Sequence, residues 1–292
     1  MSARAEDAFR ADIVEVGRRM YARGYVASND GNISIRLDDG TILTTPKSVS
    51  KGFMTADMMV VVDLDGKKIR GTRDASSELL MHLEVYKNRP DVRAVVHAHP
   101  PTATGFAVAG IPLDRAVLAE VVTTLGSIPI AEYGTPSTPE LPAAVRKYIK
   151  AYDGLLLANH GALTIGPDVF AAYYKMETIE HFAKISLVAR QLGREHLLSR
   201  EEVVRLQDLR GNYGIKSPAP ICADPSTSSG SSGAESSDDP ANCQIVQAPS
   251  AHGARLIPSD PADLDGEIRL SYRELTALIE DAVKALLGGQ HG

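Results

Sequence analysis

Cysteine is scarce in this sequence, and long apolar runs are missing from it. Two cysteines occur among 292 residues, Cys222 and Cys243, and both stand in a stretch rich in Ser, Pro and Gly. A disulfide framework is therefore not expected, and a reducing cytosol fits. No apolar run approaches the roughly 20 residues that cross a bilayer. The first residues lack the apolar core of a signal peptide, so we expect a cytoplasmic protein with no membrane partner.

Positive charge is not in excess either. The chain carries 31 Lys and Arg against 37 Asp and Glu, a net charge of −6. This balance gives no reason to expect nucleic acid or an acidic membrane as a partner. The composition is that of a globular protein, with 43% hydrophobic and 23% charged residues. The length suits one large domain, or one domain with an appendage.

Apolar spacing predicts an α/β protein with a mainly antiparallel sheet covered by helices. Segments with the helical period are 7–23, 76–88, 168–192 and 199–210. Segments that resemble strands are 32–37, 41–45, 59–64, 94–99 and 155–160. Asp38-Asp39-Gly40 joins the first two strands and favours a hairpin.

The chain changes character at residue 217. Residues 217–268 are rich in Ser, Pro, Gly, Ala and Asp, with too few apolar groups to offset the entropy of ordering, which predicts a flexible linker. Residues 269–289 predict an amphipathic helix with a capping box of Ser271 and Glu274. Its apolar face needs a partner, because a lone helix of about 17 residues is marginal in water. We expect a folded domain over 1–216, followed by the linker and the helix.

Three histidines stand at the ends of two apolar strands. His97 and His99 alternate along one strand, which puts both imidazoles on the same face about 7 Å apart. His160 ends the other strand. Three neutral imidazoles with an open position are a common catalytic Zn²⁺ arrangement, although each of these histidines alone also fits an ordinary strand or loop position. The other histidines are expected to face solvent or bond locally: His82, His181, His196, His252 and His291.

Ser76-Ser77-Glu78 stands at the start of a predicted helix. A carboxylate there is favoured by the helix dipole, and either serine suits the N-cap, which makes a capping role the simple interpretation. The free N–H groups and hydroxyls of such a start also suit a phosphate. A carboxylate beside a metal can in addition move protons as a general acid or base.

Five motifs in order along the chain support a more specific interpretation. They are Gly31-Asn32-Ile33-Ser34, Thr45-Pro46 with Val49-Ser50-Lys51-Gly52, Ser76-Ser77-Glu78 with His82, His97-Ala98-His99-Pro100, and Ala158-Asn159-His160-Gly161. Together they resemble the class II aldolase/adducin-like family, most closely its L-fuculose-1-phosphate aldolase branch. The resemblance covers about residues 7–216. It implies a catalytic domain over 1–216, folded as a three-layer α/β sandwich and assembled as a C4 homotetramer with sites between subunits.

The resemblance also implies roles for single residues. Zn²⁺ would be bound by His97, His99 and His160, with Mn²⁺ or Co²⁺ as alternatives because imidazole suits several of these ions. Glu78 would be the acid/base at the reacting carbon, Tyr133 would protonate the aldehyde-side oxygen, and Tyr213 would reach the site of a neighbouring subunit. The substrate phosphate would be held by Asn32, Lys47, Ser48, Ser76 and Ser77. Lys47-Ser48 departs from the family, whose aldolases usually have a small residue and Gly there.

The activity implied is metal-dependent aldol cleavage of a ketose 1-phosphate such as L-fuculose 1-phosphate. The products would be dihydroxyacetone phosphate and an aldehyde such as lactaldehyde. Three alternatives stay open: a sugar-phosphate 4-epimerase, a decarboxylase of the same superfamily, or a non-catalytic adducin-like interaction module. Related epimerases usually carry Asp where Glu78 stands, and the adducin heads lack the metal ligands.

The segment after Ser217 resembles the encapsulation peptides of bacterial microcompartment cargo enzymes. A shell protein is therefore an expected partner of the C-terminal helix, and the inside of a microcompartment an expected location. The alternative is that this helix packs on its own tetramer.

Overall fold

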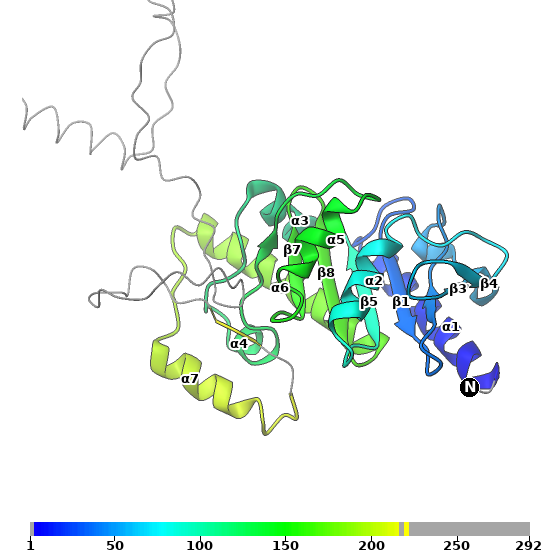
Figure 1. The fold of residues 1–292 in the computed structure, drawn as a ribbon. Coiled ribbons are helices and arrows are strands. Elements are labelled where there is room, and N and C mark those ends of the chain that lie inside the picture. Colours follow the sequence, from blue (N-terminus) through cyan, green and yellow to red (C-terminus); the bar gives the residue numbers. More distant parts are fainter. Residues whose placement is uncertain (1–2, 216–218, 222–292) are drawn as a thin grey trace, which may run out of the picture. The chain divides into compact units, whose positions relative to one another are not determined.

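The computed structural model describes residues 3–215 and 219–221 (Figure 1). The helices are α1 (Ala3–Ala22), α2 (Leu79–Asn88), α3 (Pro101–Ala109), α4 (Ala119–Thr124), α5 (Glu140–Arg146), α6 (Val169–Gln191) and α7 (Arg200–Leu209), with the single turns η1 (Lys51–Phe53) and η2 (Ala56–Met58). The strands are β1 (Asn32–Arg36), β2 (Ile42–Thr44), β3 (Val60–Val62), β4 (Lys68–Arg70), β5 (Ala94–Ala98), β6 (Ile130–Ala131), β7 (Gly154–Leu157) and β8 (Gly161–Gly166). The helix predicted at 269–289 and both cysteines lie outside the described residues, as does most of the predicted linker.

The strands form one sheet in the order β4-β3-β2-β1-β5-β8-β7-β6. The predicted hairpin is present, with Ser34 opposite Thr44. The sheet is mixed, because β6 pairs parallel with β7 while the other neighbours are antiparallel. The expectation of a mainly antiparallel sheet therefore holds, with one parallel edge pair added.

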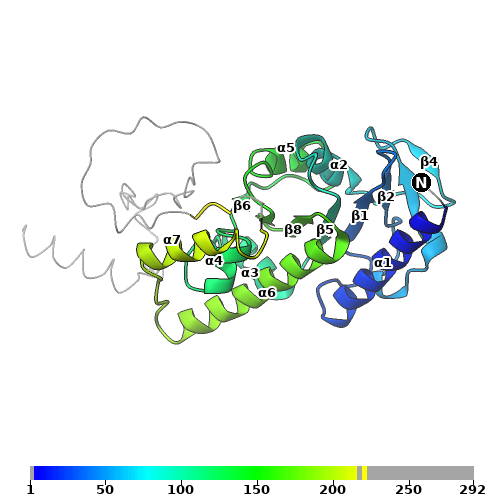
Figure 2. The same ribbon diagram turned by 90° about the horizontal axis from the view of Figure 1, so that it is seen from below.

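Alternation along the strands divides the buried side chains into two cores, one on each face of the sheet. On β5, Ala94 and Val96 join the core that contains α1, α3 and α6, whereas Val95 joins the core that contains α2 and α5. Figure 2 shows α2 and α5 on one side of the sheet and α1 and α6 on the other. The arrangement is a three-layer α/β sandwich.

The short described segment 219–221 lies against the folded domain. The Pro220 carbonyl accepts a hydrogen bond from the Ser127 N–H at 2.9 Å, so residues 219–221 contact the loop after α4 even though the sequence assigned them to the linker. Among the described residues, no helix is long and apolar enough to cross a membrane.

Candidate active site

The topology brings distant segments to one edge of the sheet. Strands β5 and β7 run in the same direction because each is antiparallel to β8, and β6 is parallel to β7. The C-terminal ends of β5, β6 and β7 therefore lie on the same side of the sheet, at the ends of the strands. The N-terminal end of β1 lies there too, since Asn32 is opposite His97. This edge collects the histidines, Asn32 and the segment that leads to Tyr133.

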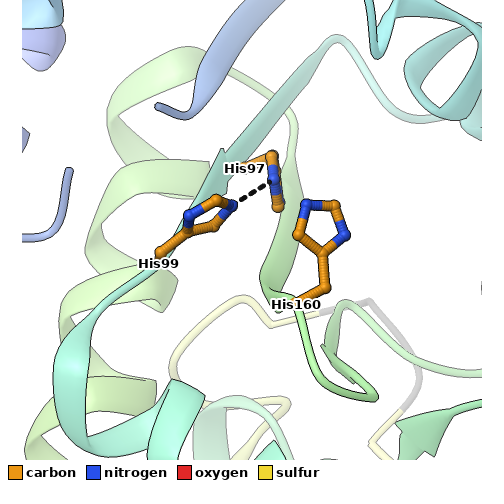
Figure 3. Close-up of side chains that lie close together, drawn as sticks. All are labelled: His97, His99 and His160. Atoms are coloured by element: carbon orange, nitrogen blue, oxygen red, sulfur yellow. Dashed lines mark hydrogen bonds between the residues drawn. The ribbon is translucent and has the colours of Figure 1, made fainter. Parts of the chain in front are cut away.

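The three histidines predicted to bind metal converge on one point (Figure 3). Their nearest ring nitrogens all lie within 4.8 Å of one another, and Nε2 of His97 is 3.1 Å from Nε2 of His99. Two nitrogens at about 2.0–2.1 Å from a tetrahedral Zn²⁺ are about 3.3 Å apart. The cluster therefore has the donor type and spacing of a three-histidine metal site.

Hydrogen-bonding groups behind the rings orient two of these imidazoles. Nδ1–H of His97 donates to the Ala162 carbonyl at 2.9 Å, and Nδ1 of His99 lies 3.5 Å from a carboxylate oxygen of Asp30. Both contacts leave Nε2 facing the cluster, as in metal sites whose ligands are held from outside. Burial, aided by His97 and His160, lowers the pKa of His99 to about 3, so its ring is neutral and able to bind a cation at pH 7.

The turn after β7 places His160. The strand ends at Leu157, three residues earlier than the sequence predicted, and Asn159 adopts a left-handed backbone with φ of 55°. Asn tolerates this conformation better than most residues. A Cβ at Gly161 would lie 2.5 Å from the Ala98 carbonyl oxygen and 2.6 Å from the His99 ring. Only glycine lets β8 begin this close to the histidines. Nδ1 of His160 is buried and has no hydrogen-bond partner among the described residues.

Glu78 occupies the N-cap position of α2, yet its carboxylate does not cap the helix. The expected serine N-cap is not found; instead the Ser76 hydroxyl accepts a 3.3 Å bond from the Glu78 N–H. The carboxylate lies 3.0 Å from Nε2 of His160 and 3.4 Å from Nε2 of His97, and it accepts a 2.8 Å bond from the Asn32 amide. Glu78 therefore borders the position where the three imidazoles meet.

The electrostatic surroundings keep this carboxylate ionised. Burial alone would raise the pKa of Glu78, but the imidazoles of His97 and His160 outweigh burial and hold it well below its usual range. In their neutral forms the three imidazoles offer three nitrogen donors beside this carboxylate, a set suited to a divalent cation and to proton transfer beside it.

The residues predicted to hold phosphate lie in two adjoining segments and at the start of β1. The Ser76 N–H donates to the Thr45 carbonyl at 3.1 Å, and the Lys47 N–H donates to the Asp74 carbonyl at 2.9 Å. These bonds hold the Lys47-Ser48 loop against Ser76 and Ser77. Lys47, Ser48 and Ser77 are not buried, and Ser48 has a left-handed φ of 58°.

The two predicted tyrosines remain apart from the cluster. The side chains of Tyr133 and Tyr213 are exposed, at 59% and 66%. Within the described part of this chain, neither forms a hydrogen bond or ring contact with Glu78 or the three histidines. Tyr133 follows β6 at the edge that carries the site, whereas Tyr213 follows α7.

Three residues beside the site were not assigned a role from the sequence. Asp30 lies against His99, and Lys51 is buried with its ammonium donating to the Asn29 and Val49 carbonyls at 2.9 and 2.7 Å. His82 was expected to face solvent or bond locally, which is wrong: it is 1% exposed and bonds to Ser34 on β1. The spacing of four residues between Glu78 and His82 could have predicted this burial, because it puts both side chains on one face of α2.

Comparison with known proteins gives a consistent family match. The model described as Class II Aldolase and Adducin N-terminal domain matches residues 11–187. A 3-oxo-tetronate 4-phosphate decarboxylase of Pectobacterium atrosepticum is 34% identical over 191 residues, 64% of this chain and 87% of that protein. An L-fuculose phosphate aldolase of Methanococcus maripaludis is 34% identical over 181 residues, 62% of this chain and 97% of that protein. The crystal structure of L-fuculose-1-phosphate aldolase from Thermus thermophilus is 30% identical with a TM-score of 0.58, covering 65% of this chain and 98% of that one.

Proposed function

The chain belongs to the class II aldolase and adducin family and is a lyase, and we propose that it breaks a carbon–carbon bond beside the ketone of a small phosphorylated sugar. The proposed reaction is aldol cleavage of a ketose 1-phosphate resembling L-fuculose 1-phosphate. Dihydroxyacetone phosphate and an aldehyde such as lactaldehyde would be the products. The supporting observation is the convergence of three imidazole nitrogens within 4.8 Å, with the Glu78 carboxylate 3.0 Å from one of them.

His97, His99 and His160 would hold the divalent cation, Zn²⁺ by preference or Mn²⁺ or Co²⁺. When bound, such a cation acts as a Lewis acid and stabilises negative charge on oxygen next to the broken bond. Glu78 then removes a proton from the reacting carbon in the synthetic direction and returns one in the cleavage direction. Its low pKa and its bond from Asn32 fit a carboxylate held ionised and in a fixed orientation.

The remaining residues are assigned to the two ends of the substrate. The phosphate would lie between the Lys47-Ser48 loop, the Ser76-Ser77 segment and Asn32, where an ammonium and hydroxyls suit an anion. Tyr133 would donate a proton to the aldehyde-side oxygen. Tyr213, exposed in the single chain, would act in a neighbouring subunit of a homotetramer.

Decarboxylation is the second candidate. The similarity to a 3-oxo-tetronate 4-phosphate decarboxylase favours it, and Lys47-Ser48 departs from the loop that is usual in the aldolases. Loss of CO₂ from a 3-oxo acid leaves the same negative charge beside a ketone as aldol cleavage does, so the cation and Glu78 would keep their roles. The two reactions differ in the group that leaves. The aldehyde-side oxygen exchanges a proton during aldol cleavage, whereas CO₂ leaves without proton transfer at its oxygen. Tyr133 would then be dispensable.

A product assay separates the two reactions. Purified protein would be given L-fuculose 1-phosphate, 5-deoxy-D-ribulose 1-phosphate and 3-oxo-tetronate 4-phosphate, with and without EDTA, and aldehyde and CO₂ would be measured separately. EDTA-sensitive release of aldehyde, strongly reduced in Tyr133→Phe, supports the aldolase. Release of CO₂ alone, unchanged in Tyr133→Phe, establishes the decarboxylase instead. No release of either from a protein with zinc bound would contradict both.

For the C-terminal segment we propose a targeting role, in which the helix predicted at 269–289 binds a microcompartment shell protein. The supporting observation is its apolar face after a long polar linker. The test is a chain truncated after Ile221, which keeps the contact of Pro220 with Ser127. Turnover and oligomeric state should match the full chain, while co-assembly with shell protein is lost. A truncated chain that dissociates or loses turnover would contradict the targeting role.

A further inference from the structure

Helix α2 and strand β1 face each other through polar side chains. On β1, Ile33 and Ile35 point into the core of α1, α3 and α6, so Asn32, Ser34 and Arg36 point toward α2. On α2, Glu78, His82 and Tyr86 follow at intervals of four residues and share one helical face. Two polar rows thus meet at the interface between a helix and a sheet, where apolar packing is the usual arrangement.

The two rows are connected along their length. The Asn32 amide donates to Glu78 at 2.8 Å, and the Ser34 hydroxyl lies 2.7 Å from Nδ1 of His82 and 2.8 Å from the Tyr86 hydroxyl. Arg36 donates to the Tyr86 carbonyl and lies 4.9 Å over its ring. Ser34, His82 and Tyr86 are at most 2% exposed. A one-residue slip or a rotation of α2 would break all of these bonds together.

The bond to Ser34 is the hydrogen bond that the described structure gives to the His82 ring. Burial lowers the pKa of His82 to about 3, so the ring is neutral at pH 7. Its hydrogen bond goes to Ser34 rather than to any of the three clustered histidines, and it follows Glu78 by one turn of α2. A buried polar pair such as Ser34–His82 gains little net stability over an apolar pair, but it specifies one arrangement of the elements that carry it.

We propose that Ser34 and His82 form a positioning pair, which fixes the rotation and height of α2 on β1 and so sets the Glu78 carboxylate against His97 and His160. This inference rests on the proposed function, since it assigns the pair to the proton-transfer group of the lyase. Ser34 and His82 act through α2 and touch neither metal nor substrate.

A double-mutant cycle tests the pair. The variants are Ser34→Ala, His82→Leu and the double variant. His82→Asn is the conservative replacement, because its amide group offers either a donor or an acceptor in the place of Nδ1. Thr164→Val is the matched control. Thr164 is also fully buried and its hydroxyl donates a 2.8 Å bond, but to Ala172 on the opposite layer. Zinc content, KM, kcat and Tm would be measured for each.

We expect both single variants to keep zinc and KM and to lose about 10- to 100-fold in kcat, the effect of a shift of about 1 Å in a catalytic group. The double variant should lose no more than the worse single variant, because the two residues act as a unit. His82→Asn should recover most of kcat, and Thr164→Val should lower Tm while kcat stays within about twofold. Losses that simply add, or that follow Tm in every variant including the control, would overturn the proposal.

Crystal structures give a readout that does not depend on turnover. In His82→Leu and Ser34→Ala, the Glu78 carboxylate should lie farther from Nε2 of His160 than the 3.0 Å of the native chain. A carboxylate in its native place in both variants would refute the positioning role. If the native chain turns over none of the tested substrates, the proposed function fails, but this comparison still decides whether the pair positions Glu78.

Discussion

Ser48 is a non-glycine residue in a conformation that glycine adopts without strain. Its φ of 58° is in the left-handed region, where L residues lose about 1–2 kcal/mol. Ser48→Gly should therefore leave the free energy of unfolding unchanged or raise it. Ser48→Val should lower it by about 1–2 kcal/mol, because a β-branched side chain is an outlier at positive φ. Denaturant titration of both variants measures this, and equal stability of the valine and glycine variants would contradict the strained loop.

Lys51 is a buried cation that joins two loops of the site. It links the Asn29 carbonyl, beside Asp30, to the Val49 carbonyl, beside Ser48. Burial lowers the pKa of Lys51 to about 8, although Asp30 and Glu78 oppose the shift. The unfolded chain therefore holds this proton more tightly than the folded chain between about pH 8 and 10.5, and stability gained from this group rises with pH across that window.

The test compares wild type with Lys51→Met. The difference in unfolding free energy should shift in favour of wild type by up to about 1.4 kcal/mol per pH unit above about pH 8. At about pH 7 the variant should also show a higher KM, because the loops around Asp30 and Ser48 are no longer tied. A difference that stays constant from about pH 7 to 10 would mean that Lys51 titrates like an exposed lysine.

Most residues of the candidate site were predictable because they stand in short motifs with fixed spacing. The strand that carries His97 and the helix that follows Glu78 were predicted from local pattern, whereas His160 lies in the turn after β7 and not in the predicted strand. The partners of Asp30, Lys51 and His82 were not predictable. The contact of His82 with Ser34, for example, spans 48 residues and depends on which strand lies under α2.

At the scale of elements, prediction succeeded where the periodic pattern was long. Helices α1, α2, α6 and α7 follow the predicted segments to within a few residues, and the capping box of Ser199 and Glu202 begins α7. Helices α3 and α5 were missed because they are short and each carries a proline in its first turn, and α3 also contains Gly105. Strand β6 has two residues and exists through its pairing with β7. Such elements are set by tertiary packing rather than by propensity.

Helix α3 begins two residues after His99 and is held in place by α6. The carboxylate of Glu180, 1% exposed, accepts bonds from the N–H groups of Thr102 and Ala103, the shortest at 2.8 Å. A carboxylate at a helix start stabilises the free N–H groups and the dipole. Because of this short separation, Glu180 also fixes the backbone next to His99.

We expect Glu180→Gln to lower the free energy of unfolding by about 1–2 kcal/mol and to weaken zinc binding by about tenfold. Glu177→Gln on the same helix is the control, since Glu177 pairs with Arg23 and does not cap α3. Denaturation and competition with a zinc chelator measure the two effects. Unchanged zinc affinity in Glu180→Gln would show that the capping of α3 by Glu180 does not affect the position of His99.

At the scale of the whole molecule, the three-layer sandwich explains why the site lies at one sheet edge. His97 points to the layer of α2, which lets a residue at the start of that helix reach it, while the core on the other face stays apolar. The ligands come from segments more than 60 residues apart. Cation binding should therefore tie β5 to the turn between β7 and β8 and stabilise the entire sandwich.

Zinc at about a hundred times its dissociation constant should add about 2.7 kcal/mol to stability and raise Tm by about 5–10 °C. His160→Ala should lose most of this shift, because two imidazoles remain. Thermal scans of both chains, after EDTA treatment and dialysis, measure the effect. An equal shift in His160→Ala would place the cation elsewhere on the protein.

The most direct test of the central claim is the rate of dihydroxyacetone phosphate release from a ketose 1-phosphate by zinc-loaded wild type and Glu78→Gln, at equal zinc content. Glu78 is assigned to proton transfer, which contributes about 10²- to 10⁴-fold to the rate. The wild type should release product in an EDTA-sensitive reaction, and the variant should be slower by that factor while its three histidines keep the metal. Equal rates in the two chains would contradict a lyase whose proton is moved by Glu78 beside a cation on His97, His99 and His160.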